Sequence, residues 1–226
     1  MKRTVKDPDV RRSELVSTAQ QLFFAKGYEN TSVSDIVNTV GVAQGTFYYY
    51  FDSKQAVLES VVGELVEQTM AVVQPVITNQ NLDAISKWNQ IIQLIGNWKI
   101  KQKGDLLAMA QIMRMAENLP LQQKLRSEMS RLVASEFVPV VVQGIEEGVF
   151  ETDYPQEATE HAFAVMSLAS DAVLDILFTQ EQFENPAMDA WDKICAAQTA
   201  IERLLGAPCG SLYLADQETL TAWFKE

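Results

Sequence analysis

The strongest constraint on the fold is a pair of short helical patterns within residues 32–51. Residues 32–35 read Ser-Val-Ser-Asp, which fits a capping box, and apolar residues then repeat at helical spacing up to Gly41. Phe47 and Phe51 form an i, i+4 apolar pair in the segment that follows. A glycine turn this short forces two helices to cross steeply, so the spacing predicts a helix-turn-helix.

The second helix, predicted over residues 44–50, keeps uncharged polar groups on the side away from its apolar pair. A helix face that is only solvated normally carries Lys and Glu, whereas amide, hydroxyl and phenol groups indicate a docking surface. Gln can pair with adenine, hydroxyls can bond to bases or phosphates, and a glycine lets the backbone approach DNA closely. The alternative is that the tyrosines pack on neighbouring helices and only their phenol tips are wet. The outward set is Gln44, Gly45, Thr46, Tyr48 and Tyr49.

Helical spacing also dominates the rest of the chain, where no strand-like alternation occurs. Only 10 Gly and 7 Pro occur in 226 residues, which disfavours a turn-rich β fold. We therefore expect an all-α protein. Its further helices are predicted from Pro8 to Gly27, from Lys54 to Pro75, over 82–103 with a break at Gly104, over 106–117, over 121–147 with a kink at Pro139, from Pro155 to Phe178, over 186–205, and as a short docked helix within 211–226.

The residue inventory argues against most catalytic and metal chemistry. His161 is the only histidine, the two cysteines lack metal-ligand spacing, and no phosphate-binding glycine motif is present. We expect no metal, no cofactor and no enzymatic activity. An enzyme using Asp171 and Asp175, which share a helix face at i, i+4, remains an alternative, as does a protein-interaction module using the tyrosine-rich face.

The chain lacks the marks of export or of a membrane anchor. The first fourteen residues are charged throughout, and the most apolar stretch, Ala162 to Phe178, carries two aspartates and fits an internal helix. We expect a cytoplasmic protein with no membrane contact.

Charge is distributed unevenly along the sequence. Residues 1–56 hold seven basic and six acidic side chains, a net charge of +1, whereas the whole chain carries −12. The remainder is therefore strongly acidic, at −13. Only the amino-terminal end is suited to approach a polyanion.

Residues 11–62 resemble the amino-terminal signature of the TetR family of transcriptional regulators. The resemblance is carried by Ala19 to Phe24, Gly27-Tyr28, Thr31 to Val33, Asp35-Ile36, Gly41 to Ala43, Gly45 to Tyr48, Phe51 and Ser53-Lys54. It implies an all-helical homodimer with an amino-terminal three-helix DNA-binding domain, over residues 1–52. A larger ligand-responsive and dimerisation domain would span 53–226, opened by a connecting helix over 53–74.

The resemblance also implies roles for individual residues of the first domain. Gln44, Thr46, Tyr48 and Tyr49 would face the major groove, while Thr31, Tyr50 and Lys54 are candidates for phosphate contacts. Ala43 lacks the hydroxyl that some relatives place before the recognition helix, so the start of that helix has no side-chain cap. The partner is then double-stranded operator DNA, and the protein is expected to be a repressor released by a small, largely apolar effector.

Two further sets of residues are predicted in the larger domain. Soft and aromatic side chains of the middle helices can line an adaptable apolar pocket, although such residues are often only core. This pocket set is Trp88, Ile92, Trp98, Met109, Met113, Phe137 and His161. The last two large helices look more apolar than one-sided burial requires, which in a TetR-like protein fits an isologous dimer interface; both helices buried within one monomer is the alternative. The interface set is Val165, Ala169, Val173, Trp191, Gln198 and Ile201.

Overall fold

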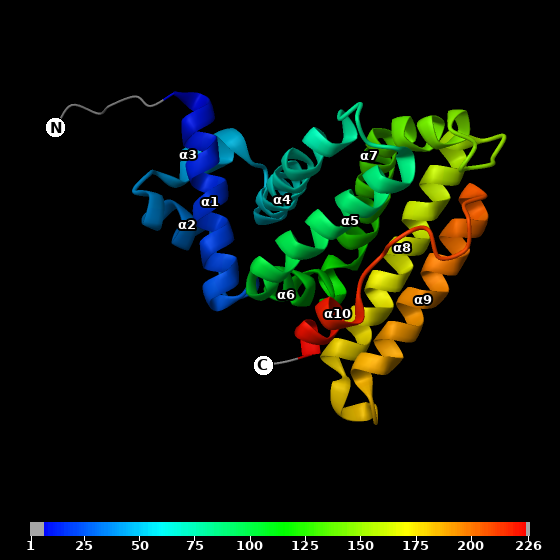
Figure 1. Ribbon diagram of the computed structural model, residues 1–226. Helices are drawn as coiled ribbons and strands as arrows, with labels where there is room; N and C mark the ends of the chain where they lie inside the picture. Colours follow the sequence, from blue (N-terminus) through cyan, green and yellow to red (C-terminus); the bar gives the residue numbers. More distant parts are fainter. Residues whose placement is uncertain (1–6, 225–226) are drawn as a thin grey trace. The chain divides into compact units, whose positions relative to one another are not determined.

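The computed structural model describes residues 7–224, which form helices and no strand (Figure 1). The prediction of an all-α protein is confirmed. The α-helices are α1 (Pro8–Lys26), α2 (Val33–Val40), α3 (Gln44–Tyr50), α4 (Lys54–Ile77), α5 (Ala84–Lys101), α6 (Lys103–Met113), α7 (Leu119–Glu146), α8 (Pro155–Phe178), α9 (Pro186–Leu205) and α10 (Gln217–Phe224). Two short 3-10 segments lie at Ala116–Asn118 and Gln180–Gln182.

Local capping signals fix the ends of several helices. The side chain of Asp7 accepts the N–H of Asp9 at the start of α1, and Asn185 caps α9 in the same way. The left-handed glycines Gly41 and Gly206 end α2 and α9. These three helices therefore begin and end close to where the sequence places them.

Two predicted breaks differ from the structure. Helix α4 continues two residues past Pro75, to Ile77. Gly104 lies inside the first turn of α6, and the interruption falls at Gln102, whose N–H caps the carbonyls at the end of α5. A glycine in a first turn costs little, because the amides there have no partner within the helix in any case.

The chain divides into two compact units. The first contains residues up to 68 together with 104–122, and the second contains 69–103 together with 123 onwards. Helix α4 runs without interruption across residue 68, and its opening turns belong to the first unit. The predicted domain boundary between residues 52 and 53 stays a prediction.

The first unit packs α1, α2, α3 and the start of α4 around one apolar core. Its buried residues come from every one of these helices, so the three-helix arrangement expected from the sequence is stabilised by mutual burial. Leu22 and Val40 are only half-buried. The fully enclosed members are Leu15, Val16, Ala19, Phe23, Ile36, Phe47, Val57, Leu58 and Val61.

An aromatic cluster lies at the centre of the second unit. Trp88, Phe137 and Phe163 contact one another, with ring centroids 4.7–6.2 Å apart in tilted or edge-on geometry. Ile201 and Leu205 of α9 belong to the same core and are completely buried. Ile201 has no exposed surface to offer a second chain, which corrects its predicted place in a dimer interface.

Hydrogen bonds from side chains to the backbone hold the segment after α9 against α5. The amide of Asn89 donates to the Ser211 carbonyl at 2.9 Å and accepts the Tyr213 N–H at 2.6 Å. The Trp88 indole N–H donates to the Tyr213 carbonyl at 3.2 Å. Buried Glu202 accepts the N–H of Leu212 at 3.1 Å. We call residues 206–216 the C-terminal strap.

Helix α8 is the one described helix long and apolar enough to cross a membrane by length and composition. Only 22% of its most apolar stretch is buried within the single chain. Leu168, near its middle, is 64% exposed. In Figure 1, α8 (yellow-green to yellow) lies alongside α9 (orange), and the two are in extensive contact.

Candidate nucleic-acid interface

Helix α3 presents one buried anchor and a mostly exposed, uncharged surface. Phe47 is its only buried residue, packed on Phe51 at 5.7 Å between centroids. Tyr48 and Tyr49 are 51% and 77% exposed. Gln44 and Gly45 are exposed as well. The structure therefore brings most of the predicted groove-facing residues together on one accessible surface, which we call the α3 face: Gln44, Gly45, Tyr48 and Tyr49.

The three consecutive tyrosines have different surroundings. Tyr48 packs edge-on against Phe47 at 5.4 Å, and Tyr49 packs edge-on against Tyr50 at 4.9 Å. Tyr50 and Thr46 are only half-buried. Ring-to-ring contact restricts the side chains without covering the phenols of the two exposed tyrosines. The alternative in which all three tyrosines pack inward does not describe this helix.

Helix α3 begins without a side-chain cap. Ala43 has extended backbone geometry and makes no capping hydrogen bond, as its methyl side chain predicts. A seven-residue helix with no cap is marginal alone. Its position depends on burial of Phe47 and on the segments at either end of the helix-turn-helix.

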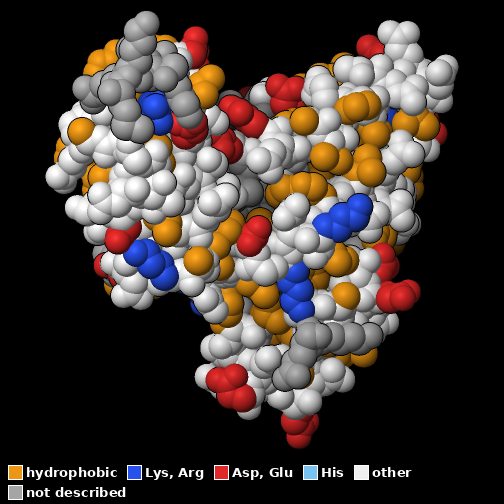
Figure 2. All heavy atoms as spheres, turned by 90° about the vertical axis from the view of Figure 1, so that its left-hand side faces the viewer, with side chains coloured by type: hydrophobic (Ala, Val, Ile, Leu, Met, Phe, Trp, Pro, Cys, Tyr) orange, Lys and Arg blue, Asp and Glu red, His pale blue; other side chains and the backbone are white. Residues whose placement is uncertain are grey.

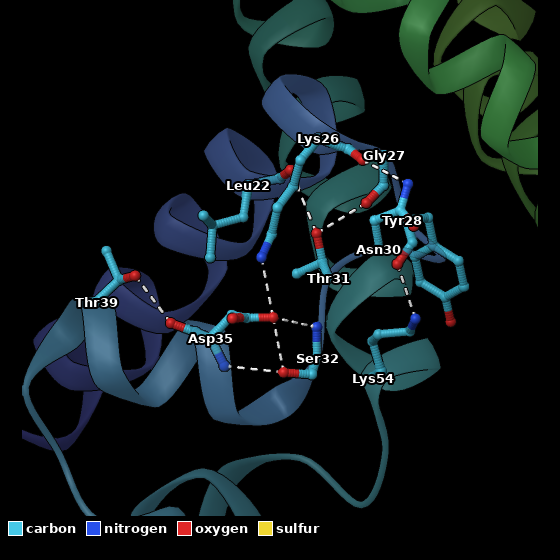
Figure 3. Close-up of polar contacts among 10 residues, drawn as sticks. All are labelled: Leu22, Lys26, Gly27, Tyr28, Asn30, Thr31, Ser32, Asp35, Thr39 and Lys54. Atoms are coloured by element: carbon cyan, nitrogen blue, oxygen red, sulfur yellow. Dashed lines mark hydrogen bonds and ion pairs between the residues drawn. The ribbon is translucent and has the colours of Figure 1, made fainter.

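The turn between α1 and α2 contains Thr31, which the resemblance suggested as a phosphate contact. The structure places it inside the domain, 1% exposed. Its hydroxyl donates to the Gly27 carbonyl at 2.8 Å, with the Leu22 carbonyl at 3.3 Å (Figure 3). Its side chain therefore stabilises the end of α1, because a buried hydroxyl without such partners would be costly.

The start of α2 is held by a reciprocal capping box. Ser32 Oγ accepts the Asp35 N–H at 3.1 Å, and the Asp35 carboxylate accepts the Ser32 N–H at 2.8 Å and its hydroxyl at 2.7 Å. Lys26 of α1 adds an ion pair with Asp35 at 2.9 Å (Figure 3). The hydrogen bonds from Ser32, together with Lys26, hold the pKa of Asp35 far below its usual range.

The four basic residues described within positions 7–56 all have partners inside the protein. Arg11 pairs with Glu14 at 2.6 Å, and Lys26 pairs with Asp35. Exposed Arg12 donates to Ser60 of α4 at 2.8 Å and lies 5.1 Å from the Phe51 ring centroid. Half-buried Lys54 donates to the Tyr28 carbonyl at 2.8 Å. On the face in Figure 2, Lys and Arg form separated groups with no continuous basic patch.

The residues predicted to line an effector pocket are divided between the two units. Met109 and Met113 lie on α6 in the first unit. Trp88, Ile92 and Phe137 are buried in the core of the second unit. Trp98 of α5 is half-buried, and His161 is exposed on α8, which corrects its placement in an interior pocket. The structure thus brings three of the seven together, around the aromatic cluster.

Several contacts of the first unit and of the C-terminal strap could not be predicted from local sequence patterns. Tyr28 and Lys54 are 26 residues apart, and Asn89 and Tyr213 are 124 apart. Neither pair shares a helix or a turn, so no local spacing connects its members. The Lys26–Asp35 pair is likewise formed between helices.

Comparison with known proteins gives the identity of this helix-turn-helix. Residues 15–61 match the family described as bacterial regulatory proteins, tetR family. That range begins in α1 and ends in α4, and it includes the whole α3 face. Residues 15–61 carry the amino-terminal domain of the TetR family. The matched family consists of regulatory proteins, which favours regulation over the enzyme alternative based on Asp171 and Asp175.

Curated relatives share this domain at moderate identity. The chain is 38% identical over 60 residues to the HTH-type transcriptional regulator EthR of Mycolicibacterium smegmatis, covering 26% of this chain and 28% of that protein. It is 37% identical over 51 residues to the HTH-type transcriptional repressor KstR2 of Rhodococcus jostii, covering 23% of this chain and 25% of that one. The matches thus span about a quarter of these relatives' length.

Solved structures share the fold over most of the chain. A TetR-family regulator from Pectobacterium atrosepticum aligns with a TM-score of 0.63 at 17% identity, covering 91% of this chain and 100% of that one. RolR in complex with resorcinol aligns with a TM-score of 0.61 at 17% identity, covering 97% and 95%. The similarity confirms the TetR architecture, with a helix-turn-helix domain followed by a larger helical part.

Proposed function

We propose that this chain is a homodimeric repressor that binds operator DNA through the α3 face and is released by a small, largely apolar effector. The observation that carries the proposal is the exposed surface of Gln44, Tyr48 and Tyr49 on a helix whose only buried residue is Phe47. Amide and phenol groups can hydrogen-bond to base edges and phosphates in the major groove. A cytoplasmic location follows from that partner.

Two copies of α3 would read two half-sites of one operator. In a helix-turn-helix dimer, the recognition helices enter successive major grooves about 34–36 Å apart, so the operator should be roughly palindromic. We assign base contacts to Gln44, Tyr48 and Tyr49, close backbone approach to Gly45, and backbone positioning to Thr46 and Tyr50. Recognition by neutral groups suits a chain whose net charge is −12.

Helices α8 and α9 supply the proposed dimer contact. The apolar stretch of α8 is mostly unburied within one chain, and Leu168 is among its exposed residues. Covering it with a second copy of the same surface would remove that apolar area from water. Ala169 is largely buried already, whereas Val165, Val173, Trp191 and Gln198 keep partial exposure and are the predicted contributors that can reach a partner.

The proposed effector site lies around the aromatic cluster of the second unit. Trp88, Phe137 and Ile92 offer apolar and aromatic surface, and a structural neighbour, RolR, has been solved with resorcinol. The effector must bind more tightly to the arrangement whose α3 helices miss the half-site spacing. A coupling of about 1–3 kcal/mol would change DNA affinity about 5–150-fold. Trp98 remains a proposed member of the site, whereas Met109 and Met113 belong to the first unit and stay a prediction.

Selection of duplexes from a random-sequence DNA library tests the proposal. The wild-type chain should retain a palindromic sequence, and Gln44→Ala and Tyr48→Ala should each weaken its binding by about 1–3 kcal/mol while relaxing preference at particular bases. Glu29→Ala, which changes an exposed residue in the turn after α1, is the matched control. A chain that selects no duplex, even at low salt, would overturn the function.

A further inference from the structure

We propose that Lys54 is a positioning residue for the recognition helix and that its ammonium holds the turn after α1 instead of contacting a DNA phosphate. This inference rests on the proposed DNA-binding function and concerns how the protein holds α3 for that task. Lys54 is the first residue of α4 and follows α3 by only three residues, 51–53.

The carbonyl groups at the end of α1 and in the turn after it accept hydrogen bonds from side chains outside that helix. Thr31 donates to the carbonyl of Gly27, and Asn30 Nδ2 donates to the carbonyl of Lys26 at 3.1 Å. Lys54 Nζ completes the set by donating to the Tyr28 carbonyl at 2.8 Å (Figure 3).

The Tyr28 side chain provides a second partner for the same ammonium. Lys54 Nζ lies 4.0 Å from the Tyr28 ring centroid, within the range of a cation–π contact. Tyr28 is 6% exposed and packs against Phe23 at 5.1 Å between centroids. The site that receives Lys54 is therefore fixed by the core of the domain.

The position of this contact along the chain gives it a mechanical role. Lys26 pairs with Asp35 at the start of α2, and Tyr28 receives Lys54 at the start of α4. Lys26 and Tyr28 are only two residues apart. Their partners, Asp35 and Lys54, lie near the start of α2 and just after α3. Both ends of the α2–α3 segment are thus fastened to the same place, which sets the orientation of the α3 face.

A phosphate contact would compete with this arrangement. Moving the ammonium towards DNA would remove a charged donor from the Tyr28 carbonyl and uncover the ring beneath it. The Tyr28 carbonyl would keep only the Thr31 N–H, at 3.1 Å. The hydrogen bond that is lost is to a charged group, and such bonds are among the stronger ones in proteins. Lys54 therefore contributes to binding by placing α3 and adds no released counterion.

Salt-dependent titration of the selected duplex separates the two roles. We expect Lys54→Met to weaken binding about tenfold, as the loss of one charge-assisted hydrogen bond predicts, with an unchanged slope of log affinity against log salt. Tyr28→Leu, which removes the ring without altering any cation, should weaken binding in the same way. The double variant should lose less than the two single losses combined, because both act on one contact. Lys193→Met, an exposed lysine of α9, is the charge-matched control.

A slope reduced by about 0.9 in Lys54→Met, with additive effects in the double variant, would show a phosphate contact and overturn the inference. Wild-type chain that selects no duplex would overturn the proposed function itself, a different result. Acylation of lysines in the wild-type chain gives a reading even if the variants fail to fold. Slow labelling of Lys54 that DNA leaves unchanged supports the positioning role, and strong additional protection by DNA contradicts it.

Discussion

The side-chain amide of Asn89 in α5 accepts the Tyr213 N–H at 2.6 Å and donates to the Ser211 carbonyl at 2.9 Å. One side chain thereby satisfies two backbone groups of the C-terminal strap. The strap also provides, through the Tyr213 carbonyl, the hydrogen-bond acceptor for the indole of Trp88 at the centre of the aromatic cluster.

Asn89→Leu should loosen the strap. Two part-buried backbone groups lose their partners, so we expect a loss of about 1–3 kcal/mol in the free energy of unfolding. Hydrogen exchange at residues 211–213, followed by mass spectrometry, should accelerate along with the fall in thermal stability. Gln93→Leu, an exposed position on the same helix, is the control and should change neither.

Gly206→Ala should destabilise the chain more than Gly148→Ala, although both glycines have positive φ, +62° and +72°. A Cβ at Gly206 would lie 2.3 Å from the Glu151 carbonyl oxygen, whereas a Cβ at Gly148 would meet nothing within 4 Å. Each variant incurs the left-handed backbone cost of about 1–2 kcal/mol, and only the first adds a backbone clash. Denaturant midpoints measure the difference, and equal losses would contradict this account.

Stability should fall in alkaline solution through the strap. Burial and the hydrogen bond to Asp216 raise the pKa of Tyr213 to about 12 from 10.0. The folded chain keeps this proton after the unfolded chain has released it, so stability is complete below pH 10 and declines as pH rises towards the folded value. In Tyr213→Phe, the free energy of unfolding should change less with pH across this window than in the wild-type chain.

Ser32→Ala removes one half of the capping box of α2. We expect a loss of about 1 kcal/mol in unfolding free energy and weaker operator binding, because α2 supports α3. Urea unfolding of the two proteins provides the measurement. Ser34→Ala, at an exposed position in the same helix, should behave like wild type, and a similar loss in both would refute a capping role.

Leu168→Glu should convert the proposed dimer into monomers, because it places a charge on an apolar surface that a second chain would cover. Sedimentation velocity at micromolar concentration gives the oligomeric state. Val10→Glu alters an apolar residue of α1 that is 51% exposed, and this control should leave the dimer intact. Dimers that persist in Leu168→Glu would refute the assigned surface.

The fold was predictable from the sequence where its signals are local. The bounds of α2 and α9 follow from Ser32 and Asn185 at their starts and from left-handed glycines at their ends. The exposed chemistry of α3 was predictable for the same reason, since a short helix with one apolar pair leaves its other side outward.

Contacts between distant segments could not be predicted in this way. Thr31 was suggested as a surface residue but is buried, because the carbonyls that receive its hydroxyl face inward at the end of α1. The helical spacing of Ile201 is consistent both with a dimer interface and with the core of one chain. Only the packing of α9 against its own chain shows that Ile201 belongs to the core. Helical spacing identifies an apolar face but does not specify which neighbour covers it.

Phe47 is the single residue of α3 that the protein core requires. The exposed side chains of this helix, those of Gln44, Tyr48 and Tyr49, can be exchanged at lower cost in stability, since much of their surface meets solvent. A descendant of this chain could therefore acquire a different surface chemistry on α3 through a few substitutions within two helical turns, while its scaffold was inherited unchanged.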